Sequence, residues 1–163
     1  MGAVAVDAGG VPAEWVEGTV ATPGQPTVLF FGGGGCRSCV LERNRPAAER
    51  LAAVTGARVL SIDCSAGSAD SRRAAVERGL TAYRWLLGEG CDLDTTAFTA
   101  GGADARLVTD ILQGARARAL PLPALGVRCG AGRAKDVILP APPGSLAGRA
   151  RDSKMLGAAG PGG

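Results

Sequence analysis

Residues 30–39 read FFGGGGCRSC, and this stretch holds two kinds of residue that could do chemistry. Glycines directly after an apolar run predict a loop whose bare backbone N–H groups face a ligand. Cys36 and Cys39 form a CxxC motif, which predicts instead a redox or metal pair on the first turn of a helix. The rest of the chain has to decide between a glycine loop and a thiol pair.

A thiol-redox site is one alternative. A strand, a CxxC motif and a helix in this order form the thioredoxin arrangement, in which the helix N-terminus activates the first thiol. However, the glycines stand where such proteins carry an aromatic residue, and the strand–helix pattern after Cys39 is too long for that fold. Zinc is less favoured, because the chain has no histidine and only one closely spaced cysteine pair. Cys64, Cys91 and Cys129 occur singly and predict buried or incidental thiols.

Composition excludes several classes of function. The 163 residues, 46% of them hydrophobic, fit one domain with a sizeable core. The net charge of +3 is spread over arginines interleaved with acidic residues, which predicts a solvated surface and no nucleic-acid site. Neither a secretory leader nor an apolar run of membrane-spanning length is present, so we expect no membrane span, a cytoplasmic location and reduced thiols. The absence of histidine removes the commonest general base, and no cofactor is predicted.

The elements that must position these residues alternate between strands and helices. An N-terminal β-hairpin is expected from 3–7 and 13–20, and continuous apolar runs predict buried strands. The alternation predicts an α/β fold, a mostly parallel sheet with flanking helices. The further expected strands are 27–31, 57–63, 95–98 and 124–128, and the expected helices run from Asn44-Arg45-Pro46 to Gly56, over 74–87 and over 103–119.

The chain also resembles a known family. Seven blocks, in order, are similar to the N-terminal half to two-thirds of a hormone-sensitive-lipase-like esterase, an α/β hydrolase. The resemblance covers nearly the whole chain and implies a partial α/β-hydrolase fold over residues 1–139, whereas the Gly/Pro/Ala-rich residues 140–163 are expected to be a disordered tail. The blocks are VDAGGVPAEWV (6–16), VLFFGGGG (28–35), RPAAERLAAVTGARVLSID (45–63), AAVERGLTAYRWLL (74–87), TAGGADARLV (99–108), LPLPAL (120–125) and ARDSKML (150–156).

The resemblance favours the glycine loop. In this family a His-Gly-Gly-Gly loop after a central strand supplies backbone N–H donors to the oxyanion of the tetrahedral intermediate. Gly33, Gly34 and Gly35 match the three glycines, and Gly32 stands where the family carries histidine. The resemblance therefore places Gly33 and Gly34 in the oxyanion hole and makes the two cysteines substitutions within the loop.

The nucleophile elbow of the family, G-x-S-x-G, corresponds to residues 97–101. The resemblance places Thr99 at the position of the catalytic serine, with Ala97 in place of the leading glycine and the N–H of Ala100 as a third oxyanion donor. Of a further Asp-Tyr-Arg block only Asp63 remains. Asp63 either keeps a family role or only caps the turn that follows it.

Three functional hypotheses follow, and the sequence leaves open whether the chain is an enzyme. The first is a truncated carboxylic-ester hydrolase homologue with little or no activity, because the part of the family that supplies the catalytic Asp and His is missing. The second is a non-catalytic module that binds a small acyl ester, or that self-associates through an unpaired sheet edge at 124–128. The third is the product of a decayed gene.

Overall fold

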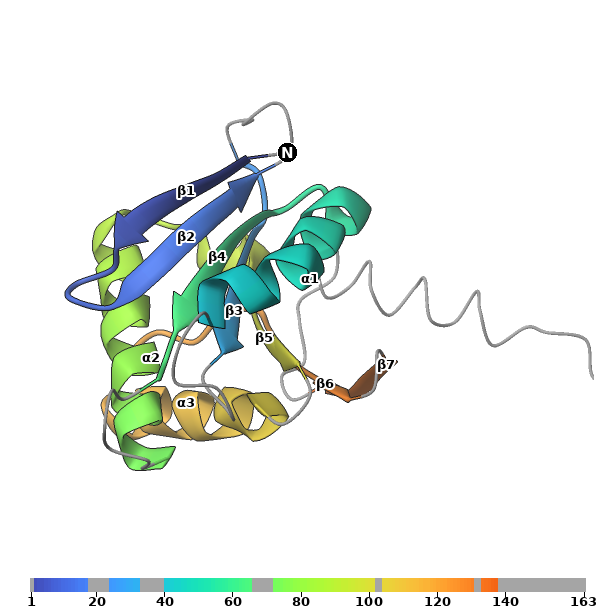
Figure 1. Ribbon diagram of the computed structural model, residues 1–163. Helices are drawn as coiled ribbons and strands as arrows, with labels where there is room; N and C mark the ends of the chain where they lie inside the picture. Colours follow the sequence, from blue (N-terminus) through green and yellow to red (C-terminus); the bar gives the residue numbers. More distant parts are fainter. Residues whose placement is uncertain are drawn as a thin grey trace, which may run out of the picture.

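The computed structural model describes residues 2–17, 24–32, 40–65, 72–101, 104–130 and 133–137. These residues form one seven-stranded sheet in the order β1-β2-β4-β3-β5-β6-β7, with helices on both faces (Figure 1). The strands are β1 (Gly2–Asp7), β2 (Pro12–Glu17), β3 (Thr27–Gly32), β4 (Arg58–Asp63), β5 (Thr96–Gly101), β6 (Leu125–Gly130) and β7 (Arg133–Val137). The helices are α1 (Val40–Thr55), α2 (Arg72–Gly88), α3 (Ala105–Ala117) and the short 3-10 helix η1 (Leu93–Thr95). The expected α/β architecture is confirmed.

The N-terminal hairpin is also confirmed. β1 and β2 pair antiparallel, and the Ala8 N–H donates to the Val11 carbonyl at 2.9 Å to close the turn. Gly9 and Gly10 between them have φ values of 72° and 93°, a region that glycine enters without steric cost. β2 then pairs antiparallel with β4, which joins the hairpin to the rest of the sheet.

Strands β4, β3, β5 and β6 are parallel and form the centre of the sheet. All six residues of β3 are buried, as expected for a continuous apolar run covered on both faces. Alternate residues of the central strands face opposite layers. Leu29, Phe31, Leu60, Ile62 and Phe98 pack with residues of α2 and α3, whereas Val28, Phe30, Val59 and Ala97 pack with Ala48 and Ala52 of α1.

The start of the first helix differs from the prediction. α1 begins at Val40, four residues before Asn44, so Pro46 lies inside the helix and not in its first turn. Pro46 has no N–H to donate to the carbonyl of Glu42, so α1 lacks one i→i−4 hydrogen bond at this point. The predicted end is confirmed, since Gly56 follows the last helical residue with a φ of 67°.

The predicted unpaired edge at 124–128 is wrong. β7 pairs antiparallel with β6, so β6 is an interior strand and β7 is the outermost strand on that side of the sheet. The sequence of β7, RAKDV, carries three charged residues in five and has no apolar run that would predict a strand. The predicted tail at 140–163 lies outside the described residues.

An ion pair between a buried carboxylate and a partly exposed arginine attaches α1 to β2. The carboxylate of Glu14 on β2 is only 4% exposed and accepts two hydrogen bonds from Arg45 of α1, at 2.7 Å from Nη2 and 3.2 Å from Nε. This hydrogen bonding and the charge of Glu14 raise the pKa of Arg45. The two-pronged geometry fixes the position of the helix along the hairpin as well as its orientation.

The same turn of α1 passes very close to the end of β3. A Cβ atom added to Gly32 would lie 2.0 Å from Nδ2 of Asn44 and 3.2 Å from Cγ1 of Val40. Nδ2 of Asn44 is itself buried and has no hydrogen-bond partner within the described part of the chain. A side chain at position 32 would therefore require the side chain of Asn44 to move.

The ion pair predicts an asymmetric response to mutation. We expect Arg45→Met to lower the melting temperature by on the order of 5 °C, because it leaves the Glu14 carboxylate buried without its counter-charge. Arg50→Met, at an exposed position of the same helix, is the matched control and should have little effect. Thermal unfolding followed by circular dichroism measures both variants, and equal losses would contradict this assignment.

The close approach of Asn44 to Gly32 predicts a non-additive pair of substitutions. Gly32→Ala should reduce the free energy of unfolding by about 1 kcal/mol through overpacking, whereas Asn44→Ala should be nearly neutral because it removes an unpartnered donor. In the double variant most of the loss should be recovered, as urea unfolding of the four proteins can show. Strictly additive changes would mean that the two residues do not compete for this space.

Candidate active site

The carboxyl ends of β3 and β4 meet at the sheet edge where open α/β sheets bind ligands. Gly32 and Asp63 are register partners, and the Cys64 N–H donates to the Gly32 carbonyl at 2.7 Å. Oδ1 of Asp63 accepts a hydrogen bond from the Ser65 N–H at 2.8 Å. Asp63 therefore caps the turn that follows it, in agreement with the simpler of its two predicted roles.

The expected oxyanion loop begins at this edge, directly after Gly32. Gly33, Gly34 and Gly35, as well as Cys36 and Cys39, lie outside the described residues. The assignment of Gly33 and Gly34 to an oxyanion hole therefore stays a prediction.

Thr99 lies within β5 and not at its end. Its register partners are Phe30 on β3 and Val127 on β6, and it is 6% exposed. The ladder continues past it, because Ala100 and Gly101 still have register partners on β6. The backbone at Thr99 is thus that of a regular strand interior.

This backbone differs from that of a nucleophile elbow, in which the strand stops at the reactive residue and turns sharply into a helix. Such a turn stores strain that is seen as unusual backbone angles. Among the non-glycine residues that the structure describes, only Ala119 has a positive φ, at 53°. Over the described residues 96–101, the stretch around Thr99 therefore carries no sign of the elbow's strain.

Thr99 and Ala100 face opposite layers of the molecule. Thr99 shares a face with its neighbours Phe30 and Val127, which pack in the layer of α1. Ala100 is fully buried in the other layer, among residues of β3, α2 and α3. The structure brings Phe31 beside Ala100 in register, so Ala100 is held in the ladder on both sides.

Asn44 takes part in this region, and sequence reasoning missed it. Because a Cβ at position 32 would lie 2.0 Å from Asn44 Nδ2, any side chain there requires Asn44 to move. This includes the histidine that the resemblance places at position 32. No sequence pattern marks Asn44 for this role, since the contact depends on where α1 crosses β3.

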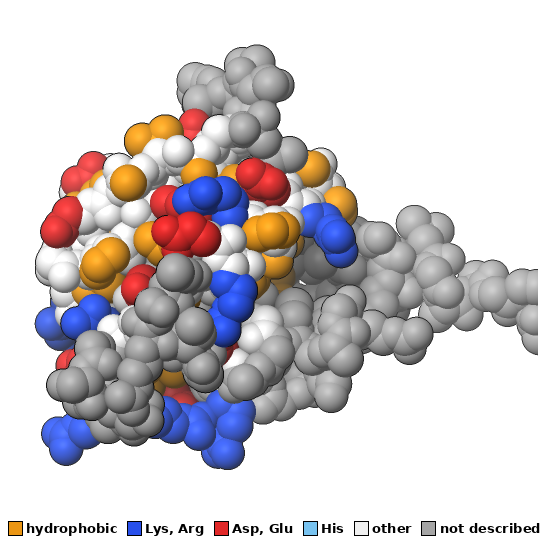
Figure 2. All heavy atoms as spheres, viewed as in Figure 1, with side chains coloured by type: hydrophobic (Ala, Val, Ile, Leu, Met, Phe, Trp, Pro, Cys, Tyr) orange, Lys and Arg blue, Asp and Glu red, His pale blue; other side chains and the backbone are white. Residues whose placement is uncertain are grey.

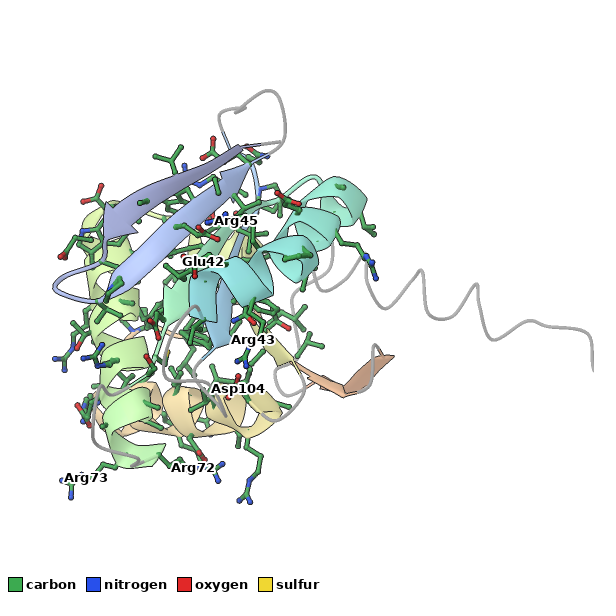
Figure 3. All side chains as sticks on the ribbon, viewed as in Figure 1. Glu42, Arg43, Arg45, Arg72, Arg73 and Asp104 are labelled. Carbon is green, nitrogen blue, oxygen red and sulfur yellow. The ribbon has the colours of Figure 1, made fainter. Side chains whose placement is uncertain are left out.

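Charges of both signs surround the edge. In Figure 3, Arg43 of α1 and Asp104, just before α3, lie near the carboxyl ends of β3 and β5. On the face shown in Figure 2, acidic side chains lie among basic ones, and the basic side chains do not form a continuous stripe.

Within the described ranges, no three His, Cys, Asp or Glu side chains cluster closely enough to hold a metal ion. No described helix is long and apolar enough to span a membrane.

The described thiols fit the prediction of ordinary, unactivated cysteines. Cys64 is fully buried, and its pKa is raised by burial and further by the nearby carboxylates of Asp63 and Asp104. The pKa of the half-buried Cys91 is also raised, mainly by burial. Raised pKa values mean less thiolate near neutral pH and hence lower reactivity. The CxxC pair lies outside the described residues, so the redox alternative is not tested by these two thiols.

Comparison with known proteins identifies the relatives of the chain. No protein-family model matches it. An acetyl-hydrolase of Streptomyces hygroscopicus is 32% identical over 122 residues, which are 75% of this chain and 40% of that protein. An esterase/lipase from an uncultured bacterium is 29% identical with a TM-score of 0.71, over 78% of this chain and 43% of its own. An esterase from the bacterial hormone-sensitive lipase family is 32% identical with a TM-score of 0.70, over 78% of this chain and 42% of its own.

The agreement covers both sequence and fold. The match to solved esterases extends over more than three quarters of this chain, whereas the chain spans only about two fifths of the length of the proteins that it matches. Over that length, the chain belongs with the hormone-sensitive-lipase-like esterases and lipases of the α/β-hydrolase fold.

Proposed function

We propose that this chain is a carboxylic-ester-hydrolase homologue that has little or no catalytic turnover on its own. Its relatives include an acetyl-hydrolase and several esterases, and their chemistry is acyl transfer to water. One observation supports the proposal above all. Thr99, at the position expected for the nucleophile, is buried in the interior of β5 and not at a strained turn.

The reaction makes demands that this position does not meet. An alcohol nucleophile must reach the ester carbonyl, and it needs an adjacent base because its hydroxyl is unreactive near neutral pH. None of the 163 residues is a histidine. A threonine also carries a β-methyl group, which restricts χ1 and crowds the approach of a substrate. The buried strand position, the missing histidine and the β-methyl group each lower the reactivity expected of Thr99.

Oxyanion stabilisation alone would contribute little turnover. In serine proteases the oxyanion hole and substrate binding leave roughly 10³–10⁴-fold catalysis after the triad is removed. We propose Gly33, Gly34 and Ala100 as the corresponding donors, with a small acyl ester as ligand. For Ala100 this role requires that its N–H is released from the ladder, and a bound ester without a nucleophile would be held and not cleaved.

The cytoplasm remains the location that we propose.

Hydrolysis of p-nitrophenyl acetate tests this function. We expect the purified chain, Thr99→Ala and Thr99→Ser to release p-nitrophenol at rates indistinguishable from buffer, each protein having first been shown to be folded by circular dichroism. Thr99→Ser is included because it removes the β-methyl group but supplies neither a base nor an elbow. Turnover by the chain that disappears in Thr99→Ala would show that Thr99 is a working nucleophile and would overturn the proposal.

A further inference from the structure

β1 is the outermost strand at one end of the sheet, and its only partner within the described residues is β2 (Figure 1). The direction of its backbone groups follows from the hairpin. Ala8 donates to Val11, so the pair Ala8–Val11 is hydrogen-bonded, and hydrogen-bonded pairs alternate with non-hydrogen-bonded pairs along an antiparallel ladder. Val4 and Val6 therefore direct their N–H and C=O groups toward β2. Those of Ala3, Ala5 and Asp7 point away from the sheet.

Residues 2–6 of this edge carry no charge, no proline and no bulge, which are features that normally protect an exposed strand. Edge strands are usually interrupted by lysine, proline or a bulge, which prevent pairing with another chain. Residues 2–6 read GAVAV, and their pairing with β2 is regular throughout. Val4 is 66% exposed, one of the two large hydrophobic side chains with high exposure in the described part of the chain.

The opposite edge differs in composition. β7 reads RAKDV, with basic and acidic residues along the strand, and a register shift lies between Arg128 and Cys129 in its pairing with β6. Charges and irregular pairing are features of edges that resist association. Of the two edges formed by described residues, β1 therefore has the fewer features that resist pairing.

We propose that β1 pairs antiparallel with β1 of a second copy of this chain, about a two-fold axis at Ala5. In this register the outward groups of Ala5 face those of Ala5 in the second copy. The outward groups of Ala3 face those of Asp7 in the second copy, and the outward groups of Asp7 face those of Ala3. All the outward-pointing N–H and C=O groups from Ala3 to Asp7 therefore find partners. The two seven-stranded sheets become one continuous sheet.

The side chains are compatible with this register. Val4 faces Val6 of the second copy in a non-hydrogen-bonded pair, where side chains are closest, so the exposed Val4 becomes covered. Asp7 faces Ala3, and the two Asp7 carboxylates are roughly 13 Å apart along the strands, beyond the screening length at physiological salt. Asp7 is also engaged in its own turn, where Oδ1 accepts from the Gly10 N–H at 2.5 Å. A two-fold contact of this kind closes on itself and ends at a dimer.

The test is analytical ultracentrifugation of the whole chain from about 1 µM to about 1 mM. We expect the weight-average mass to rise toward twice the 16.3 kDa of one chain. Ala5→Pro should raise the dissociation constant at least about tenfold, because it removes an outward N–H without touching the bonds to β2. Val4→Lys should do the same by adding charge to the edge. Val54→Lys changes the other exposed valine, which is 80% exposed on α1, and should have no effect.

Oxidative cross-linking tests the register. In Ala5→Cys the two introduced thiols face each other within disulfide range, so peptide mass spectrometry should find residue 5 joined to residue 5. In Ala3→Cys they are too far apart to join. A chain that stays monomeric at all concentrations overturns the proposal. So does a dimer that neither Ala5→Pro nor Val4→Lys weakens, or a residue 3 to residue 3 cross-link.

Discussion

The parallel ladder through β4, β3, β5 and β6 is the interaction on which the rest of the structure depends. It buries all of β3, separates the layer of α1 from the layer of α2 and α3, and fixes which residues reach the carboxyl edge. The same ladder holds Thr99 between Phe30 and Val127. A nucleophile elbow needs the strand to be released at this point, and hydrogen bonding on both sides opposes that release. The ladder thus contributes to the proposed loss of chemistry, beside the absence of histidine and the β-methyl group of Thr99.

The packing of α1 adds a second constraint at the same edge. Arg45 holds the helix to β2 through the buried Glu14 carboxylate, and in the preceding position Asn44 occupies the space next to Gly32. With the helix held there, a side chain at position 32 competes with Asn44. A histidine at position 32 would therefore require a different rotamer of Asn44.

The sequence was sufficient to predict most of the fold. Continuous apolar runs marked β3 and β4, the glycine turn marked the β1–β2 hairpin, and Gly56 marked the end of α1, because each of these signals is local. The predicted start of α1 was wrong because, in the sequence alone, a proline in the second turn of a helix cannot be told from one in its first turn. β7 was missed because RAKDV forms a strand only through its pairing with β6.

The candidate site was harder to predict, since it depends on contacts between distant segments. The sequence predicted a strand over 95–98 with Thr99 and Ala100 directly after it, and a motif match cannot show that β5 continues through both residues. The approach of Asn44 to Gly32 and the Glu14–Arg45 pair join segments that no local pattern connects. Only Glu14 could have been noticed in the sequence, because it is a charged residue between apolar residues of a strand.

The most direct test of the central claim is the reaction of the folded chain with a fluorophosphonate, a reagent that captures activated alcohol nucleophiles. Intact-mass measurement gives the extent of labelling, and peptide mass spectrometry locates it. If Thr99 is held inside the ladder of a chain that has no histidine, and is therefore not activated, as we propose, no adduct forms at Thr99 after prolonged incubation at neutral pH. A stoichiometric adduct at Thr99 that is lost on unfolding the chain beforehand would contradict the account. It would show that this strand position supports an activated nucleophile.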